Sequence, residues 1–362
     1  MKRYTTWLTI NRQCNLHCYW CYQGELLSSK DMMSLDLAGK LINLSVGMGT
    51  KKFVLIGGEP TIHPDFLEIV RQCSAADVGL LTNGISFANR GFCQRAEEAG
   101  LKSVSTSLKG ASEEDYANKC DGKHMFGKVM RAIENLEASG MQHQVSVTVS
   151  RSVVDGWEAM LRLIRECGAS SFTFSFERPV VTAKDVSFDD SMLPGEIVPF
   201  IERTMYPSLK ETGVAFDLNV TFPQCHFSEG FLSKAHAEGH AVAGCQLLMG
   251  NGIVFDPGGR VLACNHMHDH PIGEYGKDFR TLEEMSAWRD SPDIRKFYEL
   301  ASAPPGARCG GCSDWGSCGA GCRIFWLYKG ARVLLPVKSI GNRKRCHHDD
   351  KLHGSAVQAE RR

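Results

Sequence analysis

Three cysteines near the start of the chain have the spacing of a metal-binding loop. Cys14, Cys18 and Cys21 form the pattern C-x3-C-x2-C directly after a strand-like run, and Trp20 precedes the last of them. Three thiolates on this segment, the three-cysteine loop, can bind three irons of a [4Fe–4S] cluster and leave the fourth iron open. The alternative is a zinc site completed by His17, although zinc ligands are usually paired two and two. We interpret the loop as an iron–sulfur site beside which Trp20 offers a flat face to a purine ring.

A second group of cysteines occupies the last third of the chain. Its first two members flank Gly259 in the pattern C-x13-G-x4-C, the next four follow the pattern C-x2-C-x5-C-x3-C, and one more comes last. They are Cys245, Cys264, Cys309, Cys312, Cys318, Cys322 and Cys346. The stretch from Arg308 to Cys322 is rich in cysteine and glycine and has too few bulky side chains for a hydrophobic core. We therefore expect metal to hold this region together, as iron–sulfur clusters or as a pair of zinc sites.

The composition limits the classes of protein that are compatible with these sites. The 362 residues include 41 Lys and Arg, 41 Asp and Glu and 15 cysteines. Balanced charge argues against a nucleic-acid partner held through its phosphates. No apolar run approaches the about 20 residues of a membrane-spanning helix, and Met1–Thr6 does not resemble a signal peptide. We expect a cytoplasmic protein without a nucleic-acid or membrane partner, in which reduced, clustered cysteines bind metal.

An alternation of strands and helices must position these cysteines. Six runs rich in Val, Ile, Leu, Phe, Ser and Thr predict strands, most without interior charge, as in strands buried on both faces. These runs are Thr5–Ile10, Lys52–Ile56, Val78–Thr82, Ser103–Leu108, Gln144–Ser150 and Ser171–Phe176. Amphipathic segments between them predict helices at Leu35–Val46, Asp65–Ala75, Phe87–Ala99, Phe126–Ala138 and Gly156–Cys167. Six such units imply an α/β fold, a partial (β/α)6 TIM-like barrel that is open on one side.

The remainder of the chain predicts different elements. Arg178–Asp190 has the pattern of a linker, and Pro194–Glu211 predicts one more helix. The residues Asp256–Gly259 predict a tight turn between two strand-like runs, Gly252–Phe255 and Arg260–Ala263.

The first cysteine pattern resembles the signature of the radical S-adenosylmethionine (radical SAM) superfamily. The resemblance implies a radical SAM partial barrel over residues 1–220, with a [4Fe–4S] cluster and S-adenosylmethionine (SAM) bound at the strand ends. The SAM contacts that it implies are Trp20, Gly57, Gly58, Glu59, Pro60, Asn83, Ser107, Ser150 and Arg151. Glu59 could accept a hydrogen bond from the methionine ammonium, and the glycines let backbone approach a ligand. Near residues 118–123, where relatives often carry an arginine, the only basic residues of this chain are Lys119 and Lys123.

The second cysteine pattern resembles the SPASM extension, which follows the barrel in one branch of the superfamily. The resemblance implies a SPASM domain with a C-terminal tail over residues 221–362 and two auxiliary [4Fe–4S] clusters. The distal cluster would be bound by Cys309, Cys312, Cys318 and Cys346, and the proximal cluster by Cys245, Cys264 and Cys322. The fourth proximal ligand would be Cys225, a histidine or the substrate, and we expect Cys225 to be a free, buried cysteine.

The family resemblance also implies a reaction. A flavodoxin- or ferredoxin-type reductant reduces the cluster, SAM is cleaved, and the resulting 5′-deoxyadenosyl radical abstracts a hydrogen atom from an unactivated C–H bond. SPASM enzymes most often act on peptides, so we expect crosslinking, epimerisation or oxidation of a ribosomally made peptide. Only 13 residues precede Cys14, so leader recognition would need a separate leader-peptide-binding protein.

Three alternatives remain beside peptide modification. One is radical oxidation or rearrangement of a small amino acid or aminosugar-type metabolite. Another is sulfatase-type protein maturation, but the base of such relatives is an Asp where this chain has Asn265. A different class is a non-catalytic iron–sulfur or zinc protein that serves as a scaffold or in electron transfer. Asp269 and His266 are the candidate catalytic residues.

Overall fold

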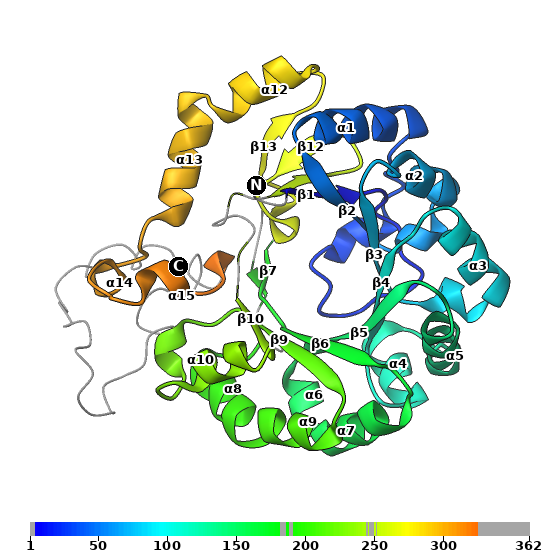
Figure 1. Ribbon diagram of the computed structural model, residues 1–362, viewed down its shortest axis with the longest axis vertical. Helices are drawn as coiled ribbons and strands as arrows, with labels where there is room; N and C mark the ends of the chain where they lie inside the picture. Colours follow the sequence, from blue (N-terminus) through cyan, green and yellow to red (C-terminus); the bar gives the residue numbers. More distant parts are fainter. Residues whose placement is uncertain are drawn as a thin grey trace, which may run out of the picture.

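One curved sheet forms the centre of the molecule (Figure 1). The computed structural model describes residues 4–181, 186–187, 191–243, 245, 250 and 252–324. Its main sheet has eleven strands in the order β10-β9-β6-β5-β4-β3-β2-β1-β11-β12-β13. Their bounds are β1 Tyr4–Thr9, β2 Thr50–Ile56, β3 Asp77–Thr82, β4 Ser103–Leu108, β5 Gln142–Val149, β6 Ser171–Phe176, β9 Ala215–Val220, β10 Ala241–Ala243, β11 Gly252–Phe255, β12 Arg260–Leu262 and β13 Pro271–Glu274. All neighbours from β10 to β11 are parallel, and β12 and β13 are antiparallel.

Helices cover the outer, convex face of this sheet (Figure 1). They are α1 Leu35–Gly47, α2 Phe66–Gln72, α3 Arg90–Glu98, α4 Glu113–Cys120, α5 Phe126–Glu137, α6 Arg151–Asp155, α7 Trp157–Glu166, α8 Pro194–Phe200, the π-helical turn η4 Ile201–Met205, α9 Tyr206–Thr212 and α10 Phe231–Ala237. Short 3₁₀ turns are η1 Gly24–Ser28, η2 Pro60–Ile62, η3 Ile85–Ala88 and η5 Gln224–His226. Ser34, Asn89 and Ser112 begin α1, α3 and α4 by accepting hydrogen bonds from backbone amides of the first turn.

The structure confirms the predicted partial barrel and extends it. The six predicted strands are β1 to β6, and the predicted helix Pro194–Glu211 is the run α8, η4 and α9. Beyond the prediction, β9 continues the sheet next to β6, and β11 pairs with β1 at the other end. The expected linker Arg178–Asp190 contains a small antiparallel pair, β7 (Val180–Val181) with β8 (Val186–Ser187).

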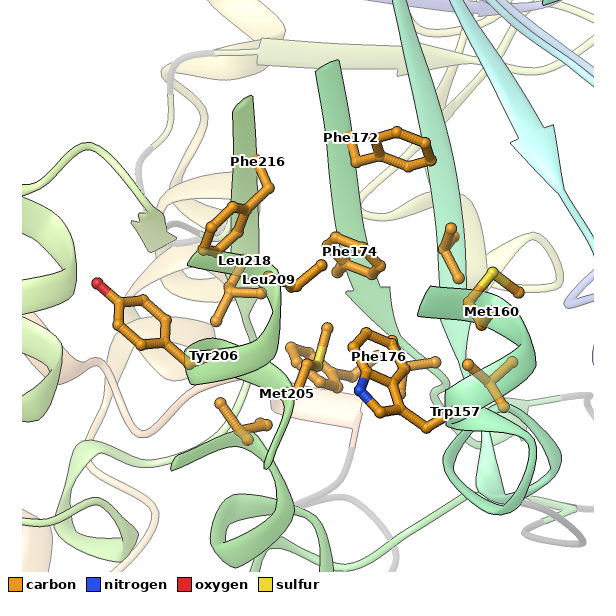
Figure 2. Close-up of a cluster of buried hydrophobic side chains, with 14 of the residues drawn as sticks. Trp157, Met160, Phe172, Phe174, Phe176, Met205, Tyr206, Leu209, Phe216 and Leu218 are labelled. Atoms are coloured by element: carbon orange, nitrogen blue, oxygen red, sulfur yellow. The ribbon is translucent and has the colours of Figure 1, made fainter. Parts of the chain in front are cut away.

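A large aromatic cluster holds the helices to β5, β6 and β9 (Figure 2). Alternate residues of β6 point into it, because successive side chains of a strand face opposite sides of the sheet. Its largest members are Trp157, Met160, Phe172, Phe174, Phe176, Met205, Tyr206, Leu209, Phe216 and Leu218. Burial of each such side chain stabilises the folded state by about 1.5–3 kcal/mol. The cluster therefore holds β5, β6 and β9 in place.

The inner face of the same strands is polar. The side chains that alternate with the apolar ones are Ser105, Ser107, Gln144, Ser146, Thr148, Thr173, Ser175, Asp217 and Asn219. Gln144 donates to Ser105 at 3.4 Å and Thr173 donates to Asp217 at 2.8 Å. These strands lack interior charge up to β6, as expected, but only their outer face is apolar. Closed barrels fill their interior with bulky Val, Ile and Leu, whereas this lining suits a polar ligand.

The C-terminal part lies along the open side of the barrel (Figure 1). After the strands β11 to β13, α12 (Leu282–Arg289) and α13 (Pro292–Ser302) lead to α14 (Ala307–Gly310) and α15 (Trp315–Cys318). Thr281 and Glu284 begin α12 with a capping box. Because β10 and β13 are the two edges of the described sheet, this arrangement places Cys309 of α14 and Cys318 of α15 between the edges.

Candidate active site

The segment after β2 packs against the chain that enters the three-cysteine loop. A Cβ atom on Gly58 would overlap the carbonyl oxygens of Arg12 and Gln13, and one on Gly57 would overlap Asn11. The amide of Gly58 donates to the carbonyl of Asn11 at 3.0 Å. Glycine is therefore required at both positions by backbone–backbone packing, and this packing sets the start of the loop.

Glu59 is a buried hydrogen-bond centre at the strand ends. Its Oε1 accepts from the amide and hydroxyl of Thr61 at 3.1 and 2.6 Å and from the hydroxyl of Thr82 at 2.7 Å. Its Oε2 accepts from the amide of Asn83 at 2.7 Å. Pro60 follows as the first residue of η2. The carboxylate thus joins the ends of β2 and β3, and a SAM ammonium would be an additional partner.

Asn83 connects β3 to the three-cysteine loop. Its Nδ2 donates to Asn15 Oδ1 at 2.6 Å and lies 4.0 Å from Cys14 Sγ. Cys14 Sγ also accepts from the amide of Leu16 at 3.4 Å. The predicted contact residue Asn83 is therefore at the loop, and Ser107 is on the inner face of β4, at the same edge of the sheet.

The end of β5 contacts the loop through a residue that the sequence did not single out. Tyr19 Oη lies 3.3 Å from Ser152 Oγ, which in turn lies 2.9 Å from Ser150 Oγ. Arg151 instead pairs with Glu196 of α8 at 3.0 Å, and both side chains are half exposed. Ser150 and Ser152 thus lie toward the loop, while the ion pair with Glu196 holds Arg151 against the helix layer.

Four thiols and one amine gather at the loop. Cys120, at the end of α4, is fully buried, and its hydrogen bond lowers the pKa of the Cys18 thiol while raising its own. Burial raises the pKa of Cys14 to about 12. Burial alone would lower the pKa of Lys109, but the thiolates of the loop and of Cys120 outweigh it and raise that pKa. Lys109 Nζ lies 6.0 Å from the ring centre of Trp20. Lys109 thus supplies positive charge beside the loop.

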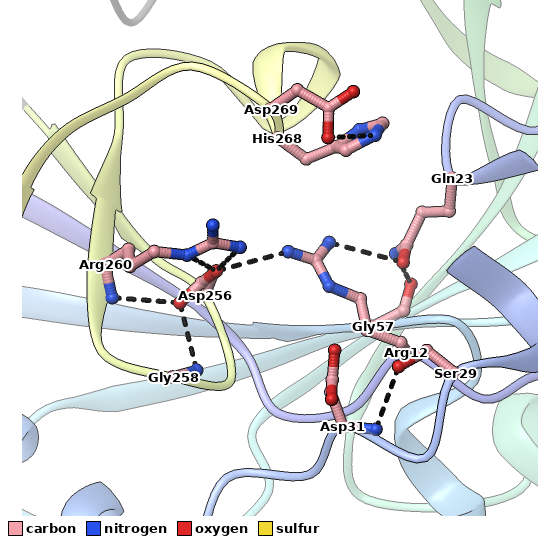
Figure 3. A network of polar contacts seen from close by, with 10 residues as sticks. All are labelled: Arg12, Gln23, Ser29, Asp31, Gly57, Asp256, Gly258, Arg260, His268 and Asp269. Atoms are coloured by element: carbon pink, nitrogen blue, oxygen red, sulfur yellow. Dashed lines mark hydrogen bonds and ion pairs between the residues drawn. The ribbon is translucent and has the colours of Figure 1, made fainter. Parts of the chain in front are cut away.

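An ion-pair network links the loop to the C-terminal hairpin (Figure 3). Arg12 lies 3.4 Å from Asp256 Oδ2 and 3.4 Å from Gln23 Oε1. Arg260 Nη2 binds the same carboxylate oxygen at 2.6 Å. Gln23 Nε2 donates to the carbonyl of Gly57 at 2.6 Å. Arg12 and Asp256 are almost fully buried, so this network joins the N-terminal half of the chain to the hairpin.

The turn η6 (Asn265–Met267) lies between the loop and the second cysteine group. The ring of His266 is 4.5 Å from that of Tyr22, and Asn265 Oδ1 and His266 Nδ1 are buried without a hydrogen-bond partner among the described residues. The same holds for Nδ1 of His268, whose Nε2 pairs with Asp269 at 3.2 Å (Figure 3). The side chain of Asp269 is one-third exposed, so His266 is the more enclosed of the two predicted catalytic candidates.

The described part of the second cysteine group divides into two sets. Burial, together with the thiolates of Cys322 and Cys245, raises the pKa of Cys264 to about 11, so these three cysteines lie near one another. Burial raises the pKa of Cys318 as well, and the thiolate of Cys312 acts in the same direction. The predicted ligand Cys346 lies outside the described residues. Cys264 thus lies near Cys245 and Cys322, and Cys318 lies near Cys312.

Cys225 was expected to be buried, and this was wrong: it is exposed. Its neighbours among the thiols are Cys318 and Cys309, both of the distal set. The turn η5 projects it toward α14 and α15 because the chain before it is held by backbone contacts with residues 321–322.

The donors present fit iron–sulfur clusters. In the described ranges, no three His, Cys, Asp or Glu side chains converge on a single metal ion. A [4Fe–4S] cluster binds each thiolate through a different iron, so its ligand set is wider than that of one zinc ion. Backbone amides donate to the sulfurs of Cys14 and Cys318 at 3.4 and 3.2 Å, and such bonds tune cluster potentials.

One cavity of about 460 Å³ lies apart from this chemistry. It is on the outer side of the barrel between α7 and α8, and its lining includes Trp157, Arg162 and Phe200. None of the predicted site residues lines it, so it is not the candidate active site.

A partial barrel with a three-cysteine loop at its strand ends defines the class of protein. Residues 8–164 match the model of the Radical SAM superfamily. This segment of the chain is therefore a radical SAM domain, and the cofactors of that family are SAM and a [4Fe–4S] cluster.

Curated relatives share sequence with different parts of the chain. The mycofactocin maturase MftC of Mycobacterium ulcerans is 27% identical over 350 residues, which cover 90% of this chain and 84% of that protein. A probable GTP 3′,8-cyclase of Pyrococcus horikoshii is 27% identical over 191 residues, or 52% of this chain. The match spans 60% of the length of that cyclase.

Solved structures share the fold over almost the whole chain. The structure of anSMEcpe with bound AdoMet has a TM-score of 0.68 at 17% identity and covers 91% of this chain and 92% of that one. Streptococcus suis SuiB bound to S-adenosylmethionine has a TM-score of 0.67 at 12% identity and covers 92% of this chain and 76% of that one. In the described part of the chain, no helix is long and apolar enough to cross a membrane.

Sequence reasoning assigned no role at the three-cysteine loop to Lys109, Cys120 or Ser152. Lys109 and Ser152 stand two residues after Ser107 and Ser150, which the family pattern singled out. Both would have been found if the two residues that follow each singled-out serine had also been considered. Cys120 had no local signal, because only the packing of α4 against the loop brings it to Cys18.

Proposed function

We propose that this enzyme modifies a peptide at a C–H bond held between the three-cysteine loop and the proximal cysteines. The observation that carries the proposal is the set of unpartnered buried polar atoms on Asn265, His266 and His268. Of these residues, His266 contacts both Tyr22 of the loop region and Cys264 of the proximal set. A peptide main chain offers alternating donors and acceptors, which would satisfy such atoms.

The comparisons support a peptide rather than a small metabolite. MftC is named a maturase, and it aligns with this chain through both halves. SuiB, which shares the fold, has been solved with its precursor peptide SuiA at a TM-score of 0.66. The GTP cyclase matches only about half of the chain. The enzyme class disfavours the alternative of a non-catalytic scaffold.

The chain's own residues would divide the work as follows. The three-cysteine loop would hold a [4Fe–4S] cluster that, with SAM bound, supplies the radical chemistry. Lys109 would balance the negative charge of the thiolates, and Trp20 would stack on an adenine ring. Asn83, fixed by Glu59, would orient the loop. The polar inner faces of β4 to β6 and β9 would bind the polar groups of SAM and substrate.

The second cysteine group would hold two auxiliary clusters in a SPASM domain that begins near residue 221. Proximal cysteines lie beside η6, so a cluster there could ligate the substrate or accept the electron left after hydrogen abstraction. An external flavodoxin- or ferredoxin-type protein would reduce the enzyme, and a separate protein would recognise a leader peptide.

Anaerobic reconstitution tests the proposal. The loaded enzyme, dithionite and SAM should release 5′-deoxyadenosine, and co-expression with short peptides encoded beside its gene should change the mass of one of them. A variant with Ala at Cys14, Cys18 and Cys21 should abolish both while keeping the auxiliary cluster signals. Asn265→Ala should raise the peptide KM and leave peptide-free SAM cleavage unchanged. Modification of a free amino acid or sugar, with no peptide changed, would refute the proposal.

A further inference from the structure

A row of polar side chains crosses the inner face of three neighbouring strands. Ser146 of β5 is in register with Thr173 of β6, and Thr173 is in register with Asp217 of β9. The neighbours of Asp217 along β9, Phe216 and Leu218, point into the aromatic cluster beneath the helices (Figure 2). Because successive side chains of a strand face opposite sides of the sheet, Asp217 faces the interior of the barrel.

Asp217 is the only ionisable side chain on the inner face of β4, β5, β6 and β9. Its Oδ1 accepts a hydrogen bond of 2.8 Å from the hydroxyl of Thr173. Burial raises the pKa of Asp217 above its ordinary value, and the bond from Thr173 opposes this only in part. No lysine or arginine of the described residues forms an ion pair with it. A partly buried carboxylate with one neutral donor is costly, and a cationic ligand would offset this cost.

The carboxylate lies below the rim of the barrel. Three residues of β9 follow Asp217, and three residues of β6 follow Thr173. At about 3.3 Å per residue, the row is about 10 Å below these strand ends along the strands. Along the axis of a barrel whose strands tilt by about 35–45°, the depth is about 7–8 Å. A main-chain group held at the strand ends does not reach Asp217, whereas the tip of a Lys or Arg side chain does.

Exposed aliphatic side chains flank this polar interior. Leu81 of β3 is in register with Ser105 of β4, and Val242 of β10 is in register with Asn219 of β9, so both face the interior. Leu81 is 40% exposed and Val242 is 52% exposed, so the structure leaves this face of both strands uncovered. Lys and Arg side chains pack their aliphatic stems on such surfaces while their charged tips contact polar groups.

We propose that Asp217 is a specificity-determining residue that binds a Lys or Arg side chain of the peptide substrate. The proposal rests on the proposed function, since it assigns one residue of that peptide. The carboxylate would pair with the ammonium or guanidinium, and the oxygens of Ser146, Thr173 and Asn219 would accept its remaining hydrogen bonds. The anchored side chain would hold the adjoining peptide main chain at the strand ends, beside the three-cysteine loop.

Binding of short peptides to the reconstituted full chain with SAM tests the proposal. The probes are dansyl-labelled peptides with alanine at every position except a central Lys, Arg, norleucine or Glu. We expect the wild type to bind the Lys or the Arg peptide about tenfold or more tightly than the norleucine peptide, the size of one charged hydrogen bond. Asp217→Asn keeps an acceptor for Thr173 and should abolish this preference. Asp155→Asn, which removes an exposed carboxylate at the end of α6, is the matched control and should retain it.

The comparison of peptides on the wild type does not depend on a variant folding. Equal affinities for the Lys, Arg and norleucine peptides, or a preference that survives in Asp217→Asn, would overturn the proposal. A modified peptide whose Lys and Arg residues can all be replaced by norleucine without a rise in KM would overturn it too and leave the proposed function standing. A preference that depends on Asp217, with no peptide modified, would support the basic-side-chain site and refute peptide modification.

Discussion

Asp256, in the turn between β11 and β12, forms a buried ion pair with Arg12, which directly precedes the three-cysteine loop. The two residues are 244 positions apart, their nearest atoms are 3.4 Å apart, and their side chains are 2% and 3% exposed. Arg260 shares the same carboxylate. The hairpin from the second half of the chain therefore stabilises the entry to the three-cysteine loop.

Removal of this carboxylate should be strongly destabilising. Asp256→Ala leaves Arg12 buried without its partner, which costs about 3–5 kcal/mol for a pair of this kind. Urea unfolding should show the loss. Asp36→Ala, which breaks an exposed pair with Lys40, is the control and should cost under about 1 kcal/mol. Equal effects of the two changes would contradict the coupling of the halves.

Glu59 should act through Asn83 rather than only on the ligand. Glu59→Gln turns an amide N–H₂ toward some of the four donors that the carboxylate now accepts, so we expect a loss of about 1–3 kcal/mol in stability. SAM cleavage should fall by about tenfold or more, because Asn83 no longer holds the loop. Thr82→Val removes one of the four bonds and should give a smaller loss of both. Full SAM cleavage by Glu59→Gln would argue against this positioning role.

Lys109 should raise the reduction potential of the cluster at the three-cysteine loop. A positive charge favours the more negative, reduced form, and an interaction on the order of 1 kcal/mol corresponds to roughly 40 mV for one electron. Lys109→Met should therefore lower the potential in an EPR-monitored titration, while Lys109→Arg should preserve it. Lys119→Met is the control, since Lys119 is paired with Asp115. An unchanged potential in Lys109→Met would contradict the assignment.

We predict that protonation of His63 lowers the stability of the fold in acid. Its Nε2 donates to the carbonyl of Met33 and its Nδ1 accepts from the amide of Asp65, both at 3.0 Å, so the folded protein needs the neutral ring. Burial lowers its pKa below the ordinary value of 6.5. At a pH between the lowered pKa of the folded state and the ordinary pKa of the unfolded chain, only the unfolded chain binds the proton. Stability is therefore retained above about pH 6.5 and falls below it, by at most about 1.4 kcal/mol per pH unit.

Urea unfolding measured at several pH values from about 7.5 to about 5, the range in which imidazole titrates, tests this effect. His63→Gln should flatten the acid loss, whereas a change at the exposed His17 should not. His143, whose pKa is also lowered by burial, should leave a residual slope. A His63→Gln profile parallel to the wild type would exclude His63 as its source.

Local patterns predicted much of the barrel and of the first site. The strands β1 to β6 and the three-cysteine loop follow from residue types and short spacings, because a strand and the loop after it depend on neighbours in sequence. The strand β9 was missed because Asp217 and Asn219 interrupt its apolar pattern. In the structure these two residues face the polar interior, and the alternation is regular.

Contacts between distant segments were decided by the tertiary structure alone. The sequence by itself determined which cysteines are clustered, but it could not say whether Cys225 lies with the proximal or the distal set. That depends on how the chain after β9 docks on the chain around Cys318 and Cys322, a contact across about a hundred residues. The pairing of Arg12 with Asp256 and the approach of Lys109 to the loop have the same origin. Each of these contacts depends on the order of the strands in the sheet, which brings together residues that are far apart in sequence. Local propensities do not determine which distant segments meet.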